Sequence, residues 1–337
     1  MIKMKLNKKR FLITGAAGTV GFAITKRLLK LGATVCAFDN SENDLFNLNK
    51  SLSKINKNLR IFLGDIRNLD RLNKASTGVD YTIHCAALKH VEISEYNSFE
   101  TILTNIIGVQ NIIESAITNN VKKVLFTSSD KSVNPSSFMG TTKLLGEKLI
   151  TAANKHKGKK QTIFSSVRFG NVLNSNGSIF KIFKNQIDKN LPLNITSEKM
   201  SRYFLSIEQA VELCFFSLKE MIGGEIFIPK MQSFDIVTLA RVMGGKNYPI
   251  NYIKPKIGEK FYEELITESE IDRTIILKSH FVIIPELNKE MINDSKLLKK
   301  IYKKYSNYKR LNRILRSDLD KSSAESLKQL LKNFKLI

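Results

Sequence analysis

The segment that most limits how this chain can fold is a glycine-rich run near its N-terminus. Glycines stand at positions 15, 18 and 21, directly after the apolar stretch Arg10–Thr14 and at the start of the amphipathic stretch Val20–Leu31. Glycines at this spacing between a strand and a helix let the backbone approach a pyrophosphate at the positive end of the helix. The run predicts a dinucleotide site made by Gly15, Gly18, Thr19, Val20 and Gly21.

The first two-thirds of the chain alternates short β-branched runs with amphipathic stretches, which is typical of a doubly wound parallel sheet. The expected strands are Arg10–Thr14, Thr34–Asp39, Arg60–Gly64, Tyr81–His84, Lys123–Ser128, Thr162–Arg168 and Glu225–Pro229. The expected helices are Val20–Leu31, Asn68–Ala75, Glu100–Asn119, Gly140–Lys155 and Ile207–Met221. We therefore predict an α/β fold, a doubly wound parallel Rossmann sheet with a smaller C-terminal substrate-binding domain.

The same pattern predicts how the chain divides into domains. After Gly170 it becomes irregular and rich in glycine and asparagine, which indicates substrate-domain material inserted between strands. We assign residues 1–170 and about 205–232 to the dinucleotide-binding domain, and residues 171–204 and about 233–290 to the substrate domain. Residues 291–337 form a basic tail that we expect to be helical.

Residues 296–337 carry +10 of the formal net charge of +23, with thirteen lysines and arginines against three acidic residues, and the remainder is scattered lysine. Such an excess would ordinarily point to nucleic acid. Because no aromatic platform is interleaved with these charges, we do not expect nucleic acid as a partner. A membrane surface or a phosphorylated substrate suits the tail better.

Cysteine usage and hydropathy predict the compartment. Cys36, Cys85 and Cys214 are odd in number, far apart and embedded in apolar runs, so neither disulfides nor a metal site is expected. A reducing cytoplasm fits this usage. Basic residues before Phe11 imitate a secretion signal, but the glycine run explains that segment better, and no apolar stretch approaches the ~20 residues that span a bilayer.

An acidic residue at the end of the second expected strand predicts which dinucleotide binds. Asp39 lies eighteen residues beyond Gly21, where a carboxylate can accept hydrogen bonds from the adenosine ribose. The same carboxylate would repel a 2′-phosphate, so we predict NAD rather than NADP. The plainer alternative is an aspartate that only solubilises the strand end.

A polar triplet after the fifth expected strand carries the candidate chemistry. Ser129, Asp130 and Lys131 occupy the place of the catalytic hydroxyl residue of short-chain dehydrogenases, and Lys143 matches the lysine of their Tyr-x-x-x-Lys pair. The tyrosine position of that pair holds Met139 instead. A thioether cannot carry a proton at neutral pH, so either the chain is inactive or Asp130 and Lys131 have taken over the proton chemistry.

Six motifs in order make the chain similar to one family. They are Ala86-Ala87-Leu88-Lys89-His90-Val91, Ser129-Asp130-Lys131-Ser132-Val133-Asn134-Pro135, Met139-Gly140-Thr141-Thr142-Lys143, Val167-Arg168-Phe169-Gly170-Asn171-Val172, Met200-Ser201-Arg202-Tyr203-Phe204 and Gly258-Glu259-Lys260. Together with the glycine run they resemble the UDP-N-acetylglucosamine 4,6-dehydratases of the extended short-chain dehydrogenases, which act in polysaccharide biosynthesis. The resemblance covers residues 10 to about 265 and leaves the tail unmatched.

The resemblance implies roles for further residues. It implies that Asp65 and Ile66 contact adenine, that Ala86 and Ala87 leave room for the cofactor, and that Lys143 binds the nicotinamide ribose. Contacts to the UDP-sugar are implied for Lys89, which also borders the cofactor, and for Asn171, Arg202 and Glu259.

The resemblance also implies how the reaction runs. Lys131 takes the C5 proton and Asp130 protonates the leaving C6 hydroxyl, which requires both pKa values to shift toward neutrality. Met139 then marks a branch of active enzymes that lack the tyrosine. The C4 hydroxyl proton would pass to Asp130 or to a water ordered by Ser129.

Other interpretations remain beside this one. A UDP-sugar 4-epimerase and a non-catalytic NAD-binding regulator are the alternative functions, and retention or inversion at C5 is left open. His84 and His90 invite a catalytic role, but we predict that they pack in the core or against the cofactor. We also expect a homo-oligomer.

Overall fold

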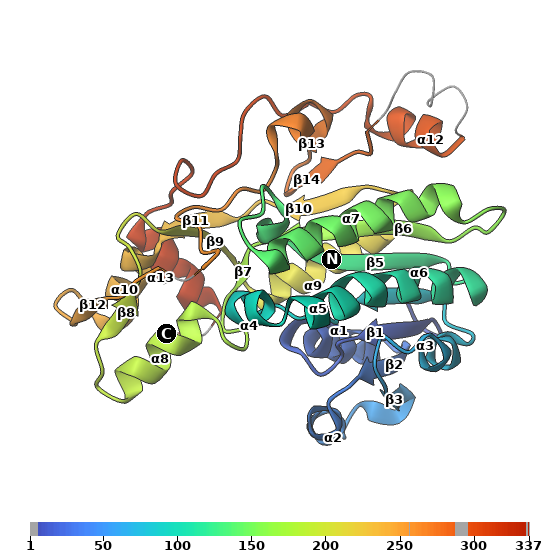
Figure 1. Ribbon diagram of the computed structural model, residues 1–337, viewed down its shortest axis with the longest axis horizontal. Coiled ribbons are helices and arrows are strands. Elements are labelled where there is room, and N and C mark those ends of the chain that lie inside the picture. The colour runs from blue at the N-terminus through green and yellow to red at the C-terminus, as the bar shows by residue number, and fades with distance from the viewer. Residues whose placement is uncertain (1–5, 256, 287–295, 335, 337) are drawn as a thin grey trace.

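The computed structural model describes residues 6–255, 257–286, 296–334 and 336. Within these ranges a sheet of nine strands forms the centre of the larger part of the molecule, in the order β13-β14-β10-β6-β5-β4-β1-β2-β3 (Figure 1). Its parallel strands are β1 (Arg10–Thr14), β2 (Thr34–Asp39), β3 (Leu59–Leu63), β4 (Tyr81–His84), β5 (Lys123–Ser129), β6 (Ile163–Phe169) and β10 (Ile226–Pro229). All seven predicted strands are confirmed to within one residue at each end.

Both faces of this sheet are buried, which explains why its strands read as nearly continuous apolar runs. Alternate residues of β1 enter different cores: Phe11 and Ile13 lie with α1 (Thr19–Lys30) and α9 (Ile207–Glu220), whereas Leu12 faces the other side. That second core is covered by α3 (Leu69–Ser76), α6 (Gly108–Thr118) and α7 (Phe138–His156). The doubly wound prediction is therefore confirmed.

The predicted helix Glu100–Asn119 is broken into three segments. α5 (Ser98–Ile102) leads into a π-helical turn, Leu103–Ile107, which α6 then continues. Two further helices, α2 (Glu42–Ser51) and α4 (Val91–Tyr96), were not predicted. Only Leu45 and Leu48 of α2 are buried, so that helix has too narrow an apolar stripe to be recognised by periodicity.

A smaller unit lies at the left of Figure 1. Its strands are β7 (Asn171–Val172), β9 (Ser201–Leu205) and β11 (Gln232–Asp235) in one sheet and β8 (Leu193–Ile195) with β12 (Ile250–Tyr252) in another. Its helices are α8 (Ile179–Asp188), α10 (Ile236–Gly244) and α13 (Ala324–Asn333). Phe180, Phe183, Leu239 and Leu331 from these three helices share one core.

The predicted boundary of the smaller domain is wrong at one place. Residues 274–283, assigned from sequence to the substrate domain, form β13 (Thr274–Ile276) and β14 (His280–Ile283), which pair antiparallel at the edge of the large sheet beyond β10. Strands of three and four residues are too short to show a periodic pattern, and their pairing with β10 depends on contacts distant in sequence.

The basic C-terminal segment packs against both parts of the molecule. Residues 291–295 lie outside the described ranges, and α12 (Lys296–Tyr305) buries Leu298, Ile301 and Tyr305 in the core that also holds α9. α13 buries Leu327 and Leu331 in the smaller unit. The helical prediction is confirmed for α12 and α13, although their lysines lie on packed helices rather than on a separate tail. None of the helices in the described ranges combines the length and the apolar character that crossing a membrane requires.

His84 occupies a fully buried position at the end of β4. Its Nδ1 lies 2.6 Å from Thr14 Oγ1, its ring stacks on Phe126, and burial together with the charge of Lys143 lowers its pKa to about 3. The predicted packing role is therefore confirmed for His84, which is neutral at physiological pH.

We expect His84 to make the protein sensitive to acid. The unfolded chain takes up a proton near pH 6.5 that the folded chain excludes until about pH 3, so the unfolded state binds more protons and stability falls as the pH drops through this window. The loss at pH 4 should be about 3 kcal/mol. Unfolding free energies from pH 7 to pH 4 should fall less steeply in His84→Asn, and equal slopes for both proteins would contradict this assignment.

Candidate active site

The candidate site forms where β5 ends and the chain turns into α7. β5 stops at Ser129, residues 130–132 make a 3-10 turn, and Ser137 caps α7 by accepting a hydrogen bond from the Gly140 amide at 3.1 Å. The carboxyl ends of parallel strands are where open α/β sheets bind their ligands. The topology therefore presents this turn at the expected edge.

The predicted triplet is brought together at short range. Ser129 Oγ donates to Asp130 Oδ1 at 2.7 Å, and Lys131 Nζ donates to the same oxygen at 3.1 Å. Asp130 is fully buried, and its other oxygen, Oδ2, has no hydrogen-bond partner among the described residues. An unpartnered buried carboxylate oxygen is costly, so this oxygen is a candidate contact for a ligand.

The first turn of α7 is pressed against this turn. A Cβ atom at Gly140 would lie 2.3 Å from the Lys131 carbonyl oxygen, so only glycine fits there. Met139, in the tyrosine position, is 3% exposed and fills space in the interior, as predicted.

The two candidate lysines have opposite surroundings. Lys143 Nζ donates to the Thr127 carbonyl at 3.1 Å and lies 4.9 Å from the centre of the Phe126 ring, and burial lowers its pKa to about 8. Burial also acts against the charge of Lys131, but the carboxylates of Asp130 and Glu263 outweigh it and raise the pKa of Lys131 above its usual value. The predicted shift of Lys131 toward neutrality is therefore wrong for the protein without substrate, because two carboxylates flank this amine.

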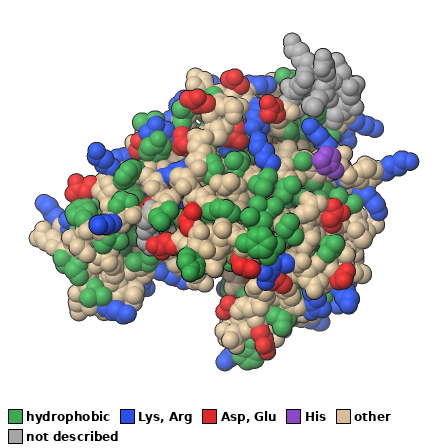
Figure 2. All heavy atoms as spheres, in the orientation of Figure 1, with side chains coloured by type: hydrophobic (Ala, Val, Ile, Leu, Met, Phe, Trp, Pro, Cys, Tyr) green, Lys and Arg blue, Asp and Glu red, His purple; other side chains and the backbone are tan. Residues whose placement is uncertain are grey.

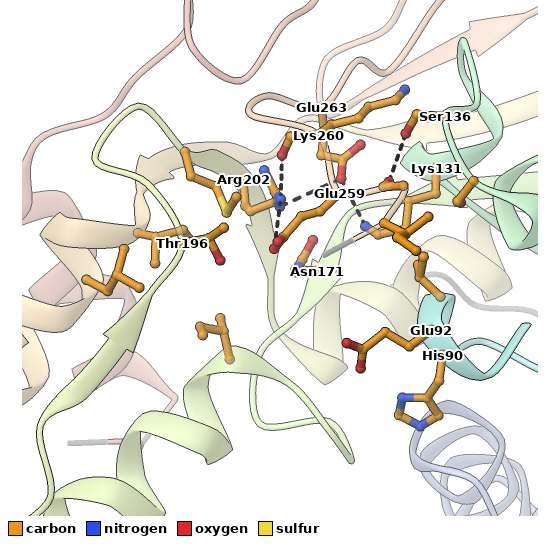
Figure 3. Close-up of a pocket in the computed structure, with 18 of the residues that line it drawn as sticks. His90, Glu92, Lys131, Ser136, Asn171, Thr196, Arg202, Glu259, Lys260 and Glu263 are labelled. Carbon is orange, nitrogen blue, oxygen red and sulfur yellow. Dashed lines mark hydrogen bonds and ion pairs between the residues drawn. The ribbon is translucent and has the colours of Figure 1, made fainter. Parts of the chain in front are cut away.

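A cavity of about 250 Å³ adjoins Lys131 and lies between the two parts of the chain (Figure 3). Three predicted substrate contacts, Asn171, Arg202 and Glu259, line it. Asn171 Oδ1 is buried without a partner among the described residues. The Arg202 guanidinium donates to the carbonyls of Ser201 and Lys260, each at 2.7 Å, which fixes its plane beside the cavity.

The glycine run has the geometry of a dinucleotide site. Gly18 caps α1 without a side-chain hydrogen bond, and the first turn of α1 contains no acidic residue, so the positive end of this helix can receive an anion. Gly15 and Gly21 are required by close packing, since a Cβ at Gly21 would lie 2.1 Å from the Gly15 carbonyl oxygen. The Ala17 amide donates to Asp39 Oδ2 at 3.0 Å, which fixes the carboxylate beside this run. These residues fit a dinucleotide.

The other predicted cofactor residues surround the same edge of the sheet. A Cβ at Gly15 would lie 2.6 Å from the Ala86 nitrogen, so Ala86 borders the glycine run closely, and Ala87 follows it in the same loop. Ile66 is buried, whereas Asp65 forms an ion pair with Arg67 at 2.7 Å. The Arg67 side chain, which hydrogen-bonds to it, keeps the pKa of the Asp65 carboxyl below its usual value. Adenine contact by Asp65 and Ile66 stays a prediction.

Lys89 connects the two parts of the molecule. Its Nζ donates to the Asn176 carbonyl at 2.7 Å, and the Asn176 amide donates to Thr19 Oγ1 at 3.2 Å. The loop around Asn176 therefore touches the start of α1. His90, in contrast to His84, is exposed and lines the cavity, so a core position is wrong for it and packing against the cofactor stays a prediction.

Two residues of the site were not predicted. Glu263 is 2% exposed and its Oε1 lies 3.2 Å from Lys131 Nζ. Asn105, in the π-helical turn, bonds to both polar backbone atoms of Leu88 and to Thr142 Oγ1, and thereby joins the loop after β4 to α7. A π-turn often marks a functional site, but sequence periodicity does not reveal one.

A buried ion-pair network lies next to the 3-10 turn at residues 130–132 and is hydrogen-bonded to it. Arg168 is 1% exposed and pairs with Glu147 of α7 at 2.6 Å and with Glu270 at 3.0 Å. Ser132 Oγ, in the 3-10 turn, lies 2.8 Å from Glu147 Oε1 and 2.7 Å from the Ser129 carbonyl. The network thus connects β6, α7 and the turn that carries Asp130 and Lys131.

The sheet order and the position of the site define a Rossmann-fold protein of the extended short-chain dehydrogenase/reductase class. Within this class the match is more specific, since the sequence profile of the polysaccharide biosynthesis protein family matches residues 11–285. The chain belongs to this family, and the resemblance carried by the six motifs is confirmed.

Individual relatives span most of the chain. A Campylobacter jejuni protein named UDP-N-acetylglucosamine 4,6-dehydratase (inverting) is 40% identical over 285 residues, which are 83% of this chain and 84% of the relative. A Rickettsia felis protein named UDP-glucose 4-epimerase is 34% identical over 284 residues, or 82% of each chain. The X-ray structure of Pen from Bacillus thuringiensis has a TM-score of 0.90 and 39% identity, covering 99% of this chain and all of that one.

Proposed function

We propose that this protein is an NAD-dependent 4,6-dehydratase that converts UDP-N-acetylglucosamine into a UDP-4-keto-6-deoxy-hexosamine for surface glycan biosynthesis. The observation that carries the proposal is the 3.1 Å contact between Lys131 Nζ and Asp130 Oδ1 beside the cavity. Elimination of water across C5 and C6 needs both a base and an acid, and this pair supplies both. The name of the 40% identical C. jejuni relative supports the same reaction.

NAD, when bound, would supply the redox chemistry, removing a hydride from C4 of the sugar and returning it to C6. The elimination between these events belongs to the side chains. Lys131 Nζ takes the C5 proton, which a C4 ketone makes acidic, while Asp130 gives a proton to the C6 hydroxyl so that it leaves as water. The proton on Lys131 returns to C5 when C6 accepts the hydride, and the net change is the loss of one water.

The ion pair already contains the proton that this step needs. Moving one proton from Lys131 Nζ to Asp130 Oδ1 along their contact makes a neutral amine and a carboxylic acid at once. Before substrate binds, the carboxylates of Asp130 and Glu263 keep the amine charged, so this transfer belongs to the elimination step itself. The elimination restores the original charges. Because Met139 cannot accept the C4 hydroxyl proton, we assign that role to Asp130, through its unpartnered Oδ2, or to a water held by Ser129. If Asp130 accepts it, Asp130 obtains its proton from the sugar and Lys131 first releases its own proton to water. If the water accepts it, the proton moves from Lys131 to Asp130 within the ion pair, and the proton from the C4 hydroxyl recharges Lys131 after C5 is protonated.

The substrate's diphosphate and uridine are assigned to the cavity wall opposite α4. Arg202 supplies a planar charged fork of the kind that binds phosphate oxygens. Asn171 and Glu259 lie on the same cavity, and Lys89, next in sequence to the cavity-lining His90, bonds to the Asn176 carbonyl. For the cofactor, the Asp39 carboxylate beside the glycine run favours NAD over a 2′-phosphorylated dinucleotide.

Incubation with UDP-N-acetylglucosamine tests the proposal directly. We expect NMR to show a product with a C6 methyl group and a C4 ketone or its hydrate, and deuterium at C5 when the solvent is D₂O. Product stereochemistry then distinguishes retention from inversion at C5. An unchanged sugar in the presence of protein that retains NAD would contradict the proposal.

A 4-epimerase is the second candidate, because a 34% identical relative carries that name. Epimerisation at C4 leaves the C6 hydroxyl in place and takes no proton from C5. A product with an intact C6 hydroxyl and no solvent deuterium at C5 would favour this candidate over the dehydratase.

We also propose a homo-oligomer. Its candidate surface is the face of α5–α7, where Figure 2 shows hydrophobic side chains gathered and where Phe99, Ile107 and Leu145 are exposed. Mass measurement by analytical ultracentrifugation tests this proposal.

Lys299, Lys300 and Lys303 are exposed on α12 and offer a candidate contact for anionic lipid.

A further inference from the structure

Glu263 lies in the proposed active site although none of the expected motifs contains it. It follows the Gly258–Lys260 turn, and its carboxylate enters the wall of the cavity next to Lys131 and Arg202 (Figure 3). Its Oε1 lies 3.2 Å from Lys131 Nζ and 3.7 Å from Arg202 Nε. The side chain is 2% exposed, and Oε2 has no hydrogen-bond partner among the described residues.

The backbone of Glu263 is fixed from outside the cavity. Its amide donates to Ser317 Oγ at 2.9 Å, and its carbonyl accepts from the Ser317 amide at 2.9 Å. Ser317 Oγ also lies 2.8 Å from Ser201 Oγ, on the strand that carries Arg202. These bonds fix the distance from Glu263 to both cationic side chains.

Lys131 is consequently flanked by two carboxylates. Asp130 contacts its Nζ from the same 3-10 turn, and Glu263 contacts it from the segment after β12. A long lysine side chain has several rotatable bonds, and two acceptors restrict its amine to one place. An anion this close in a water-poor site also favours the ammonium form strongly.

Other charged groups lie on the cavity that Lys131 lines or on the helix packed against its turn, and they are the same in wild type and variants. They are Arg202 on β9, Glu259 and Lys260 after β12, His90 and Glu92 across the cavity, and Lys143 and Glu147 on α7. Among the contacts of the described residues, Glu263 is the carboxylate outside the 3-10 turn that forms an ion pair with Lys131.

We propose that Glu263 is a positioning residue for Lys131, which fixes the amine at the cavity wall and sets the pH at which it becomes a free base. The inference rests on the proposed function, in which Lys131 takes the C5 proton. Glu263 touches neither the sugar nor the cofactor in this scheme and acts through the lysine.

The pH profile of dehydration in Glu263→Gln tests the proposal. Glutamine keeps the shape but removes the charge, so the rising limb of kcat against pH should move at least one pH unit lower, with a lower maximum because the amine is less well placed. Glu264→Gln is the matched control, since Glu264 bonds to Asn134 Nδ2 at 2.9 Å instead of to Lys131. Its profile should keep the wild-type limb.

Glu263→Asp keeps the negative charge, so the rising limb of kcat should lie at the same pH as in wild type. The rate should fall because the shorter side chain positions the amine less well. A rate that drops equally at every pH in Glu263→Gln would show a purely structural role and overturn the proposal. If Glu263→Gln does not fold, Glu263→Ala and Glu263→Asp replace it. The proposal is then overturned if the rising limb of Glu263→Ala lies at the same pH as in wild type. It is also overturned if the limb of Glu263→Asp moves as far as that of Glu263→Ala.

A second readout does not depend on turnover. The pH dependence of Lys131 acetylation by acetic anhydride, followed by mass spectrometry without substrate, reports the charge of the amine directly. We expect acetylation to begin at lower pH in Glu263→Gln than in wild type and Glu264→Gln. If the pH at which acetylation begins is lower in Glu263→Gln but none of the proteins dehydrates the sugar, the proposed function fails and the control of Lys131 by Glu263 stands. If this pH is the same in Glu263→Gln and wild type, the inference itself is overturned.

Discussion

Lys131→Ala is expected to lower the rate of dehydration about 10³-fold, because a positioned general base contributes on the order of 10² to 10⁴ in rate. The glycine run and Asp39 are separate from Lys131, so binding of NAD should be unchanged. Single-turnover measurements with UDP-N-acetylglucosamine, together with NAD titrations, check both parts. Lys148→Ala, an exposed lysine on α7, is the control and should retain the wild-type rate.

This substitution also separates the remaining classes of function. A 4-epimerase needs no proton from C5, so loss of solvent exchange at C5 together with loss of dehydration is specific to the dehydratase. A regulator that only binds NAD has no turnover to lose. Wild-type activity in Lys131→Ala would contradict the assignment of this lysine as the base.

The second large effect is expected at Arg168, where Arg168→Met should cost about 3 to 5 kcal/mol of stability. Methionine leaves the buried carboxylate of Glu147 without its ion-pair partner and leaves Glu270 with Arg273 at 3.6 Å. Urea unfolding of the two proteins measures the loss. A loss of unfolding free energy below 1 kcal/mol would show that these carboxylates find other partners or are protonated with little loss of stability.

Arg313→Met is the matched control for this measurement. Its guanidinium pairs with Asp320 at 2.7 Å, but the side chain is 57% exposed. Exposed ion pairs contribute roughly 0 to 1 kcal/mol, so this change should have a small effect. Because Ser132 links the Arg168 network to the turn that carries Asp130 and Lys131, Arg168→Met should also reduce activity at temperatures where the protein stays folded.

The strands of the large sheet could be predicted because each is a short apolar run closed by a turn. β1, β2 and β4 match their predicted bounds in full. The antiparallel edge formed by β13 and β14 could not be predicted, since its few residues carry no pattern and its partner β10 lies far away in sequence. The helix through Leu103–Ile107 was predicted without its π-turn, because hydrophobic spacing is similar in both helix types.

The candidate site was predictable where its residues are consecutive. Ser129, Asp130 and Lys131 follow one strand, and local backbone geometry alone brings them together. Glu263 could not be found in this way, because its approach to Lys131 depends on how the smaller unit closes over the sheet. The same missing carboxylate explains why the charge state of Lys131 was predicted wrongly.

The position of Ser317 limits how this protein can be recombined with its relatives. The family profile ends at residue 285, yet Ser317 bonds to the backbone of Glu263 and to Ser201. A chimera that grafted a foreign C-terminus after residue 285 would keep every motif residue and still lose the hydrogen bonds that hold Glu263 in place. The structural unit that holds Glu263 beside Lys131 therefore extends to Ser317, about thirty residues beyond the end of the family profile.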